Sequence, residues 1–200
     1  MNLRPMDAAA VCNWYDREFT ITFPPNERKP LAFILQLMET GCYTVLGLYT
    51  GTELLGYATL HRNADYPDYV LLDYLGVTAA RRNSGLDGQI LGFLEEMFRG
   101  KACIIIEAES PVPGGSEAEN TLRTRRIGFY ERAGCRPVYE IGACGIRCQT
   151  LALGPFQDLS AMAEAHQAIY GPDRTDITIP LGADESPAPA CWGSGTLTLI

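Results

Sequence analysis

The chain has 200 residues, of which 46% are hydrophobic and 20% are charged, and this is enough apolar sequence for one substantial core. Its 24 acidic and 16 basic side chains give a net charge of −8. Nucleic acid is therefore not expected as the main partner, because binding a phosphate backbone requires a basic surface. No apolar run approaches the roughly 20 residues that cross a bilayer, and residues 1–10 lack the apolar region of a secretory signal. We expect a cytoplasmic protein with no membrane partner.

Seven cysteines are scattered along the chain, several of them inside apolar runs. A free thiol in such a run behaves as a small apolar side chain. Without a secretory signal, reduced thiols are favoured over a disulfide framework. Cys144 and Cys148 have neither a second cysteine pair nor a histidine at ligand spacing nearby, so no metal site is predicted.

The N-terminal part predicts two helices followed by a hairpin. Residues 7–19 carry apolar side chains at helical spacing after Asp7, which is a favourable N-cap residue. A second helical pattern covers residues 26–40 and stops at a glycine. Two β-rich runs, 43–49 and 54–61, flank a Gly-containing turn and predict an antiparallel pair.

The middle of the chain alternates between strand and helix patterns. Residues 69–77 read as an apolar strand, in which Gly76 suggests a bulge or the close approach of another backbone. A helix from residue 86 to about residue 100 and a buried strand at 102–108 follow. Two strands joined by a helix in this way pair in parallel through a crossover. We therefore predict a mixed sheet of the α/β or α+β class.

Four further elements are predicted after this unit. A helix at about 121–133 precedes strands around 136–141 and 146–153, and residues 157–170 form another amphipathic pattern.

The composition changes beyond Gly171, where the chain becomes rich in Pro, Gly and Ser. We interpret residues 1–170 as one domain and residues 171–200 as an irregular C-terminal extension. Whether residues 196–200 add an edge strand stays open.

The most informative stretch runs from Leu75 to Gly88, between a strand and a helix. A polar, Gly-containing turn that opens a helix leaves backbone N–H groups unpaired, with the positive end of the helix dipole behind them. Such a turn favours phosphate oxygens, and Arg82 adds a positive charge. No Gly-Lys-Ser/Thr sequence follows, which disfavours a nucleotide P-loop. The simpler interpretation is a helix N-terminus capped by Ser84 or Asn83.

Two segments resemble motifs of the GNAT superfamily of N-acetyltransferases. The first is similar to that family's acyl-CoA-binding motif: Leu75-x-Val77-x4-Arg82-x2-Gly85-x-Asp87-Gly88. The second, Phe129 to Cys135, resembles the family's Tyr-x-x-x-Gly-Phe segment. The order of elements over about residues 1–153 is also similar. Two positions depart from the pattern: Asp87 replaces the last small residue of the first motif, and Arg123 stands where an Asn often precedes the Tyr.

The resemblance implies a GNAT-like fold, with a central mixed sheet flanked by helices, and an enzyme that uses acetyl-CoA and no metal. The acetyl group passes directly, in a ternary complex, to the primary amine of a small-molecule or peptide acceptor. The implied cofactor-binding residues are Leu75, Gly76, Val77, Arg82, Asn83, Ser84, Gly85, Leu86, Asp87 and Gly88. The Arg82 side chain and the amides that follow it hold the diphosphate, while an amide near Leu75–Val77 stabilises the oxyanion.

Tyr130 matches the family's general acid, which protonates the leaving thiolate. The general base is less defined. Glu107 and Glu109 end the strand after the motif helix, and Asp73 lies within the motif strand. Any of the three carboxylates could accept the amine proton, directly or through water, and His61 is a further candidate. A mechanism without a dedicated base is also open.

Structural roles compete with these assignments. By strand alternation, Asp73 should share a face with Leu75 and Val77. The three carboxylates also fit solvated strand ends or ion pairs with Arg125 or Arg126, and this basic pair could alternatively reach the cofactor phosphates. Aromatic residues of the first two helices either line the acceptor pocket or belong to the core.

Two other functions remain open from the sequence. One is a non-catalytic module that binds acyl-CoA, and the other is an interaction protein with a vestigial site. The acceptor, and whether the chain forms a homodimer, are not specified by the sequence.

Overall fold

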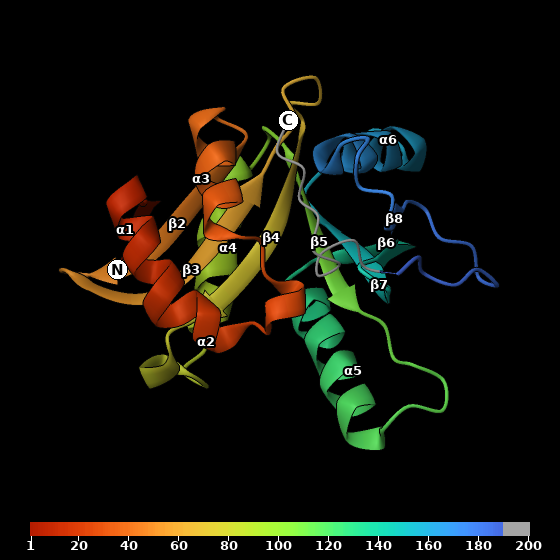
Figure 1. The fold of residues 1–200 in the computed structure, drawn as a ribbon, viewed down its shortest axis with the longest axis horizontal. Helices are drawn as coiled ribbons and strands as arrows, with labels where there is room; N and C mark the ends of the chain where they lie inside the picture. Colours follow the sequence, from red (N-terminus) through yellow and green to blue (C-terminus); the bar gives the residue numbers. More distant parts are fainter. Residues whose placement is uncertain (190–200) are drawn as a thin grey trace.

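A mixed β-sheet runs through the computed structural model of the chain, which describes residues 1–189 (Figure 1). Within these residues the strands are β1 (Asn2–Pro5), β2 (Tyr43–Thr50), β3 (Glu53–His61), β4 (Tyr69–Val77), β5 (Cys103–Glu109), β6 (Arg136–Ala143), β7 (Ile146–Leu153) and β8 (Ile177–Thr178). Their order in the sheet is β1-β2-β3-β4-β5-β7-β6-β8. The β4–β5 pair is parallel and its neighbours are antiparallel, so the predicted mixed sheet is confirmed.

Helices cover both faces of this sheet. They are α1 (Ala8–Trp14), α2 (Thr20–Thr22), α3 (Leu31–Glu39), α4 (Leu86–Phe98), α5 (Glu117–Arg132) and α6 (Leu159–Tyr170). The buried side chains of α4 and Tyr130 of α5 form one apolar cluster on one face. Helices α1 and α3 pack on the other face over β2 and β3, and α6 packs on that same face over β4, β5 and β7.

The face that each β5 residue occupies follows from strand alternation. Ile104 and Ile106 belong to the cluster under α4, whereas Cys103 and Ile105 belong to the cluster under α6. Glu107 continues the second series and so lies on the α6 face. The strand therefore carries its first carboxylate to the side of the sheet that α6 covers.

The N-terminal helix is confirmed, with a correction to the helix that follows. Asp7 accepts a hydrogen bond from the Ala10 amide at 2.8 Å, as an N-cap does. The second helix was expected over 26–40, but α3 begins only at Leu31. Pro30 explains the delay, because a proline pushes the residue before it into extended backbone. This extended residue is Lys29, which is buried although it lies outside any helix.

Three other features of the structure differ from the prediction: the start of α5 and the two edge strands, β1 and β8. Helix α5 begins at Glu117, a turn earlier than residue 121, because Tyr130 is its one buried residue and apolar spacing could not mark its start. Strand β1 was not predicted. In the C-terminal segment, β8 pairs with β6, and residues 196–200 lie outside the described residues.

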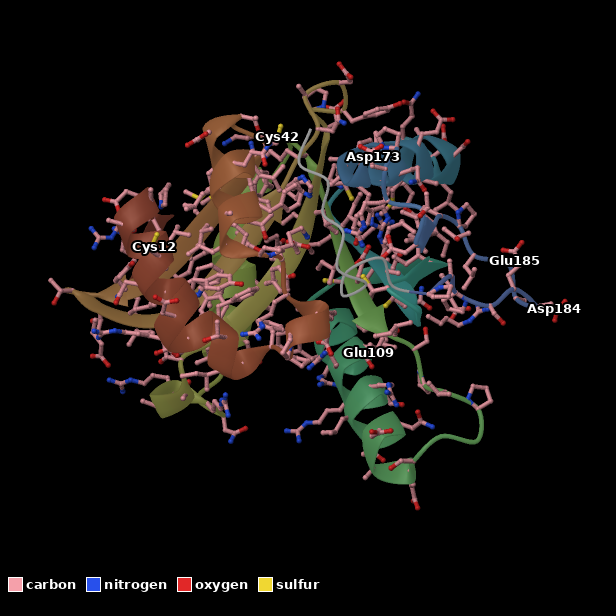
Figure 2. All side chains as sticks on the ribbon, in the orientation of Figure 1. Cys12, Cys42, Glu109, Asp173, Asp184 and Glu185 are labelled. Carbon is pink, nitrogen blue, oxygen red and sulfur yellow. The ribbon has the colours of Figure 1, made fainter. Side chains whose placement is uncertain are left out.

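The six cysteines within residues 1–189 are free. Figure 2 places Cys12 on α1 and Cys42 near the start of β2. None of the helices in this part of the chain combines the length and apolar character needed to cross a membrane.

Candidate active site

The sheet opens where β4 and β5 separate. The two strands pair only over Tyr69–Leu72 and Cys103–Ile106. Beyond these residues β4 stays with β3, and β5 stays with β7 as far as Glu109. Figure 1 shows the two strands side by side at one end and apart at the other, where α5 lies. The remainder of each strand therefore has one backbone edge without a neighbouring strand.

A β-bulge lies at the start of this opening. Thr59 of β3 is opposite Tyr74, but the next residue, Leu60, is opposite Leu72, so Asp73 is the extra residue of β4. A bulge interrupts strand alternation. Leu75 therefore packs with the α4 cluster, while Asp73 contacts residues on the opposite face. The expectation that Asp73 shares a face with Leu75 and Val77 is wrong for this reason.

Asp73 is a buried, fully engaged carboxylate. Lys29 Nζ lies 2.7 Å from its Oδ1 and 2.8 Å from its Oδ2, and the Tyr43 hydroxyl donates to Oδ2. The Lys29 and Asp73 side chains are 7% and 8% exposed. Burial acts to raise the pKa of Asp73, but the Lys29 ammonium, His61 and these hydrogen bonds outweigh it and hold the pKa below its usual range. Asp73 is therefore ionised and paired.

His61 lies behind this pair, against the Tyr43 ring, at a centroid distance of 5.4 Å. Burial, and then the nearby Lys29 ammonium, lower the pKa of His61 to about 4. Its imidazole is neutral at physiological pH, in surroundings that favour the neutral form.

Glu107 occupies the other side of the opening. The Tyr170 hydroxyl lies 2.7 Å from its Oε1 and 2.8 Å from its Oε2. His166 Nε2 lies 2.8 Å from Oε1, and the Glu107 side chain is 19% exposed. Unlike Asp73, Glu107 has no ion pair with Lys or Arg within the described residues, and its direct partners there are His166 and Tyr170.

A cavity of ≈180 Å³ lies between these groups. Its walls include Lys29, Asp73, Glu107 and Tyr170, which come from four separate segments, and Glu27 from the loop before α3. Burial, followed by the nearby charge of Glu109, raises the pKa of Glu27, although Arg126 opposes the shift. The opening in the sheet is therefore a charged pocket.

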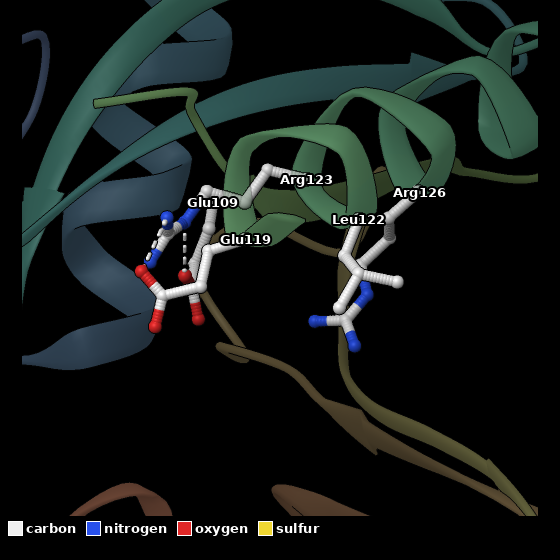
Figure 3. Close-up of a pocket in the computed structure, with 5 residues that line it drawn as sticks. All are labelled: Glu109, Glu119, Leu122, Arg123 and Arg126. Carbon is white, nitrogen blue, oxygen red and sulfur yellow. Dashed lines mark hydrogen bonds and ion pairs between the residues drawn. The ribbon is translucent and has the colours of Figure 1, made fainter. Parts of the chain in front are cut away.

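Glu109 ends β5 beside α5, as Figure 2 shows. Its Oε2 pairs with Arg123 Nε at 2.8 Å, and Arg123 also lies 3.7 Å from Glu119 (Figure 3). The expected partners were Arg125 or Arg126, but Arg126 lies beside Leu122, one helical turn before it, and away from this pair (Figure 3). Arg123, the residue that departs from the GNAT pattern, thus joins α5 to the end of β5.

The loop before α4 presents amides to solvent. Asn83 and Gly85 have positive φ values of 61° and 74°, and residues 81–85 are exposed. Among the described residues, none accepts a hydrogen bond from the amides of Asn83, Ser84 or Gly85. Gly85 holds the N-cap position, so the expected cap by Ser84 or Asn83 is wrong; the Ser84 hydroxyl donates to the Arg81 carbonyl.

Three charged side chains lie in or next to this loop: Arg81, Arg82 and Asp87. Arg81 is paired with Glu53 at 2.6 Å. Arg82 is exposed, and no residue within 1–189 forms an ion pair with it. Asp87 turns back on the helix, where its Oδ1 accepts from the Gly88 amide at 3.0 Å. One helix N-terminal donor is thus already occupied by a carboxylate.

The amides of Leu75 and Val77 point into the opening. Tyr74 N–H donates to Thr59 Oγ1 and Thr78 N–H donates to the Leu55 carbonyl, each at 3.0 Å, and both acceptors belong to β3. Because successive amides of a strand point to opposite edges, the amides at 75 and 77 face away from β3.

Gly76, between them, is explained by packing. A side chain there would meet the buried Tyr57 ring, with a Cβ 2.5 Å from the Tyr57 hydroxyl. The expected bulge lies at Asp73 instead, and the close approach comes from a side chain rather than from a backbone.

Tyr130 lies on the opposite face of the sheet from Glu107. It belongs to the α4 cluster, together with Leu72 and Ile106, the last paired residues of β4 and β5. Burial raises the pKa of Tyr130 to about 12, against the effect of Arg126, and the Asp87 charge adds to the rise. The phenol therefore stays protonated beside the opening.

Sequence reasoning did not single out Lys29, Tyr43, His166 or Tyr170 as site residues. His166 carried the one available signal, since a histidine interrupts the apolar stripe of the predicted 157–170 helix. A lysine immediately before a proline, and tyrosines in apolar patterns, give no comparable signal.

Comparison with known proteins identifies the family and the fold. The sequence model of the family described as acetyltransferase (GNAT) family matches residues 8–135. No curated protein sequence matches the chain.

Solved structures share the fold. A protein from Bacteroides thetaiotaomicron, described as an acetyltransferase from the GNAT family, superposes with a TM-score of 0.68 at 19% identity, covering 86% of this chain and 100% of that one. An aminoglycoside 6'-N-acetyltransferase complexed with coenzyme A gives 0.59 at 17% identity, over 79% and 100%. The yncA protein from Salmonella typhimurium, solved with its cofactor acetyl-CoA, gives 0.55 at 17%, over 79% and 95%.

Proposed function

This chain belongs to the acetyltransferase (GNAT) family, and from that premise we propose that it transfers the acetyl group of acetyl-CoA directly to a primary amine. The observation that carries the proposal is the opening between β4 and β5. It has unpaired amides on the β4 edge, Tyr130 on one face and Glu107 on the other. A thioester held there would have a proton donor on one side and a proton acceptor on the other.

The loop before α4 fits the diphosphate of acetyl-CoA. Its amides are free and exposed, and the α4 dipole favours an anion at this end of the helix. Arg82 is available as a cation, whereas Arg81 is engaged by Glu53. Asp87 opposes this fit, and its carboxylate must turn away from Gly88 for that amide to donate. The cofactor supplies an activated acetyl thioester.

We assign the base role to Glu107 rather than to Asp73. Both oxygens of Asp73 are taken by Lys29 and Tyr43, so it has little capacity for another proton. Glu107 lines the same pocket and, within the described residues, forms no ion pair with Lys or Arg. In this assignment Glu107 removes the ammonium proton of the acceptor, and the neutral amine attacks the acetyl carbonyl. Asp73, neutralised by Lys29, forms a fixed part of the pocket wall.

Tyr130 and the β4 amides serve the other half of the reaction. The amides of Leu75 and Val77 stabilise the oxygen that becomes negative when the amine attacks. As the C–S bond breaks, Tyr130 donates its phenolic proton to the leaving sulfur. The phenol is suited to this because burial keeps it protonated. The amide nitrogen loses its second proton to solvent, and solvent returns a proton to the Tyr130 phenolate.

A cationic acceptor, either a small molecule or a peptide, is supported by the net charge of −8, which steers cations toward the protein. The pocket lining itself is balanced, because Glu27, Asp73, Glu107 and Glu109 face Arg28, Lys29, Arg126 and Arg174. An aminoglycoside N-acetyltransferase is among the structural neighbours, and its acceptor class is one that this pocket chemistry would admit.

Tyr130→Phe tests the mechanism. Acetylated product is measured by mass spectrometry with acetyl-CoA and a panel of alkyl diamines, an aminoglycoside, free amino acids and short peptides. Loss of a general acid should lower kcat by about 10²-fold or more, with the Kd of acetyl-CoA unchanged. Tyr49→Phe, on the distant strand β2, is the matched control and should keep full turnover.

The alternative outcomes separate the competing functions. Unchanged turnover in Tyr130→Phe removes Tyr130 from the mechanism. Binding of acetyl-CoA without turnover by the unmodified protein, over the whole panel, favours a non-catalytic acyl-CoA-binding module. No binding at all contradicts both.

A further inference from the structure

A buried histidine stands behind the proposed base. His166 of α6 has an exposed fraction of 0%, and it lies in a helix whose other buried residues are apolar. Both ring nitrogens have partners: Nε2 is 2.8 Å from Glu107 Oε1, and Nδ1 is 3.2 Å from the Tyr139 hydroxyl. The residue lies outside the 8–135 segment that matches the family, and the mechanism above does not use it.

An ionised Glu107 fixes the direction of one of these hydrogen bonds, and the direction of the other follows for a neutral His166 ring. An ionised carboxylate only accepts, so His166 Nε2 must carry the hydrogen. In the neutral ring Nδ1 is then an acceptor, and the Tyr139 hydroxyl donates to it. Burial, and then the Glu107 charge, raise the pKa of Tyr139, so the phenol keeps its proton. Tyr139, His166 and Glu107 thus form one chain of donors that ends on the carboxylate.

This chain leaves one oxygen of Glu107 for the substrate. Oε1 accepts from His166 and lies within reach of Tyr170. Oε2 has Tyr170 as its one partner among the described residues, and the single Tyr170 proton can serve only one oxygen at a time. A lone pair of Oε2 therefore stays available, while the carboxylate plane is held from behind.

We propose that His166, supported by Tyr139, is a positioning residue that holds Glu107 ionised and oriented to receive the acceptor amine's proton. This inference rests on the proposed function. It also gives α6 a role in the site, because the helix brings both His166 and Tyr170 to a strand that it covers.

The phenols and thiols around this chain keep one protonation state near neutral pH. Burial raises the pKa of Tyr69 from β4, of Cys103 from β5 to about 11, and of Cys148 from β7. Burial and the Glu107 charge raise the pKa of Tyr170, on which Asp73 and Arg174 also act. Burial also raises the pKa of Glu27 in the same pocket, so a change in the acidic limb after a His166 substitution is assigned to Glu107 when it persists in the Glu27→Gln background.

Two substitutions at His166 separate positioning from packing. His166→Leu removes the donor, and His166→Gln keeps an N–H near the place of Nε2. The acceptor giving the highest turnover in the amine panel is used, and kcat, KM and their pH dependence are measured. For His166→Leu we expect kcat to fall at least 10-fold, with an unchanged Kd for acetyl-CoA.

The acidic limb of kcat/KM should also move to higher pH in His166→Leu, because a carboxylate that loses a donor is easier to protonate. His166→Gln should recover most of both properties. Met162→Leu, on the same buried face of α6, controls for packing and should change neither.

A spectroscopic measurement checks the geometry without an acceptor. The sequence has 2 histidines, so the 15N imidazole spectrum contains two rings, and His61→Phe assigns them. We expect His166 as the neutral Nε2–H tautomer. The Nδ1–H tautomer contradicts the proposal.

Activity outcomes distinguish the two proposals. An active His166→Leu with an unchanged pH profile overturns the positioning role alone. Absence of turnover in the unmodified protein overturns the proposed function, and the positioning role falls with it.

Discussion

Gly76 of β4 lies directly against the Tyr57 ring, beside the opening between β4 and β5. The Tyr57 ring that lies against it is fully buried and packs on Trp14 at a centroid distance of 5.2 Å. A Cβ at position 76 would stand 2.5 Å from the Tyr57 hydroxyl and 2.7 Å from its Cε2. The ring has no open space to move into, so the absence of a side chain at Gly76 is a packing requirement.

Gly76→Ala should therefore destabilise the protein by about 1–3 kcal/mol, as overpacking of a buried site does. The matched control is Gly92→Ala in the interior of α4, where a Cβ would have nothing within 4 Å. That variant should be more stable by roughly 0.5–1 kcal/mol, since alanine favours helix. Urea unfolding measures both. Equal stabilities for the two variants would show that the Tyr57 ring yields freely.

His61 makes stability depend on pH at the residue scale. Its pKa is about 4 in the folded protein, lowered by burial and Lys29, whereas an unfolded histidine has a pKa near 6.5. As pH falls through 6.5, the unfolded chain binds a proton that the folded protein does not. The stabilisation is therefore complete above pH 6.5 and is lost as pH falls toward about 4.

His61→Phe should remove this dependence. Between pH 7 and pH 5 the free energy of unfolding of the unmodified protein should fall by about 2 kcal/mol more than that of the variant. Urea titrations at the two pH values measure this. The same fall in both proteins would mean that other groups cause it.

At the scale of elements, the loop before α4 places two arginines side by side with different surroundings. Arg81 is committed to Glu53, while no residue of the described chain forms an ion pair with Arg82. The loop's positive φ values at Asn83 and Gly85 leave its amides turned outward. Arg81 and Arg82 therefore offer a matched test of the proposed diphosphate site, because they are neighbours and only Arg81 has an ion-pair partner among the described residues.

Arg82→Ala should weaken acetyl-CoA binding by roughly 10-fold or more, because a charged hydrogen bond to phosphate contributes about 1.5–3 kcal/mol. Arg81→Ala removes an exposed pair worth roughly 0–1 kcal/mol and should change the Kd only slightly. Titration calorimetry measures both. Equal losses would place the phosphate contact elsewhere.

The elements that could be predicted were those with strong apolar patterns. The bounds of β4, Tyr69–Val77, and of β7, Ile146–Leu153, match the structure because both strands carry apolar side chains over most of their length. The start of α5 could not be found, since its exposed residues carry no periodic signal. The bulge at Asp73 could not be found either, because a bulge depends on the register of the partner strand.

The site was predictable only in part, for a similar reason. The motif stretch and the order of elements pointed to residues near the opening, including Glu107 and Tyr130. The partners that decide their chemistry come from distant segments: Lys29 lies 44 residues from Asp73 in sequence, and His166 lies 59 from Glu107. Such pairs depend on tertiary packing, which a single sequence does not encode in a local pattern.

For the whole molecule, the arrangement of layers assigns different tasks to the two faces of the sheet. The face under α4 and α5 holds Tyr130 and lies near the motif loop. The face shared by α1, α3 and α6 holds the charged pocket with Asp73 and Glu107. The opening between β4 and β5 connects them. Acetyl-CoA entering from one face and an amine from the other would meet within the sheet.

Calorimetric titration of the full chain with acetyl-CoA, beside CoA and ATP, tests this account most directly. We expect micromolar binding of acetyl-CoA and CoA without comparable binding of ATP, since ATP lacks the thioester-bearing arm that the proposed site would hold between β4 and β5. No binding of acetyl-CoA at millimolar concentration, or ATP binding of equal strength, would contradict the account.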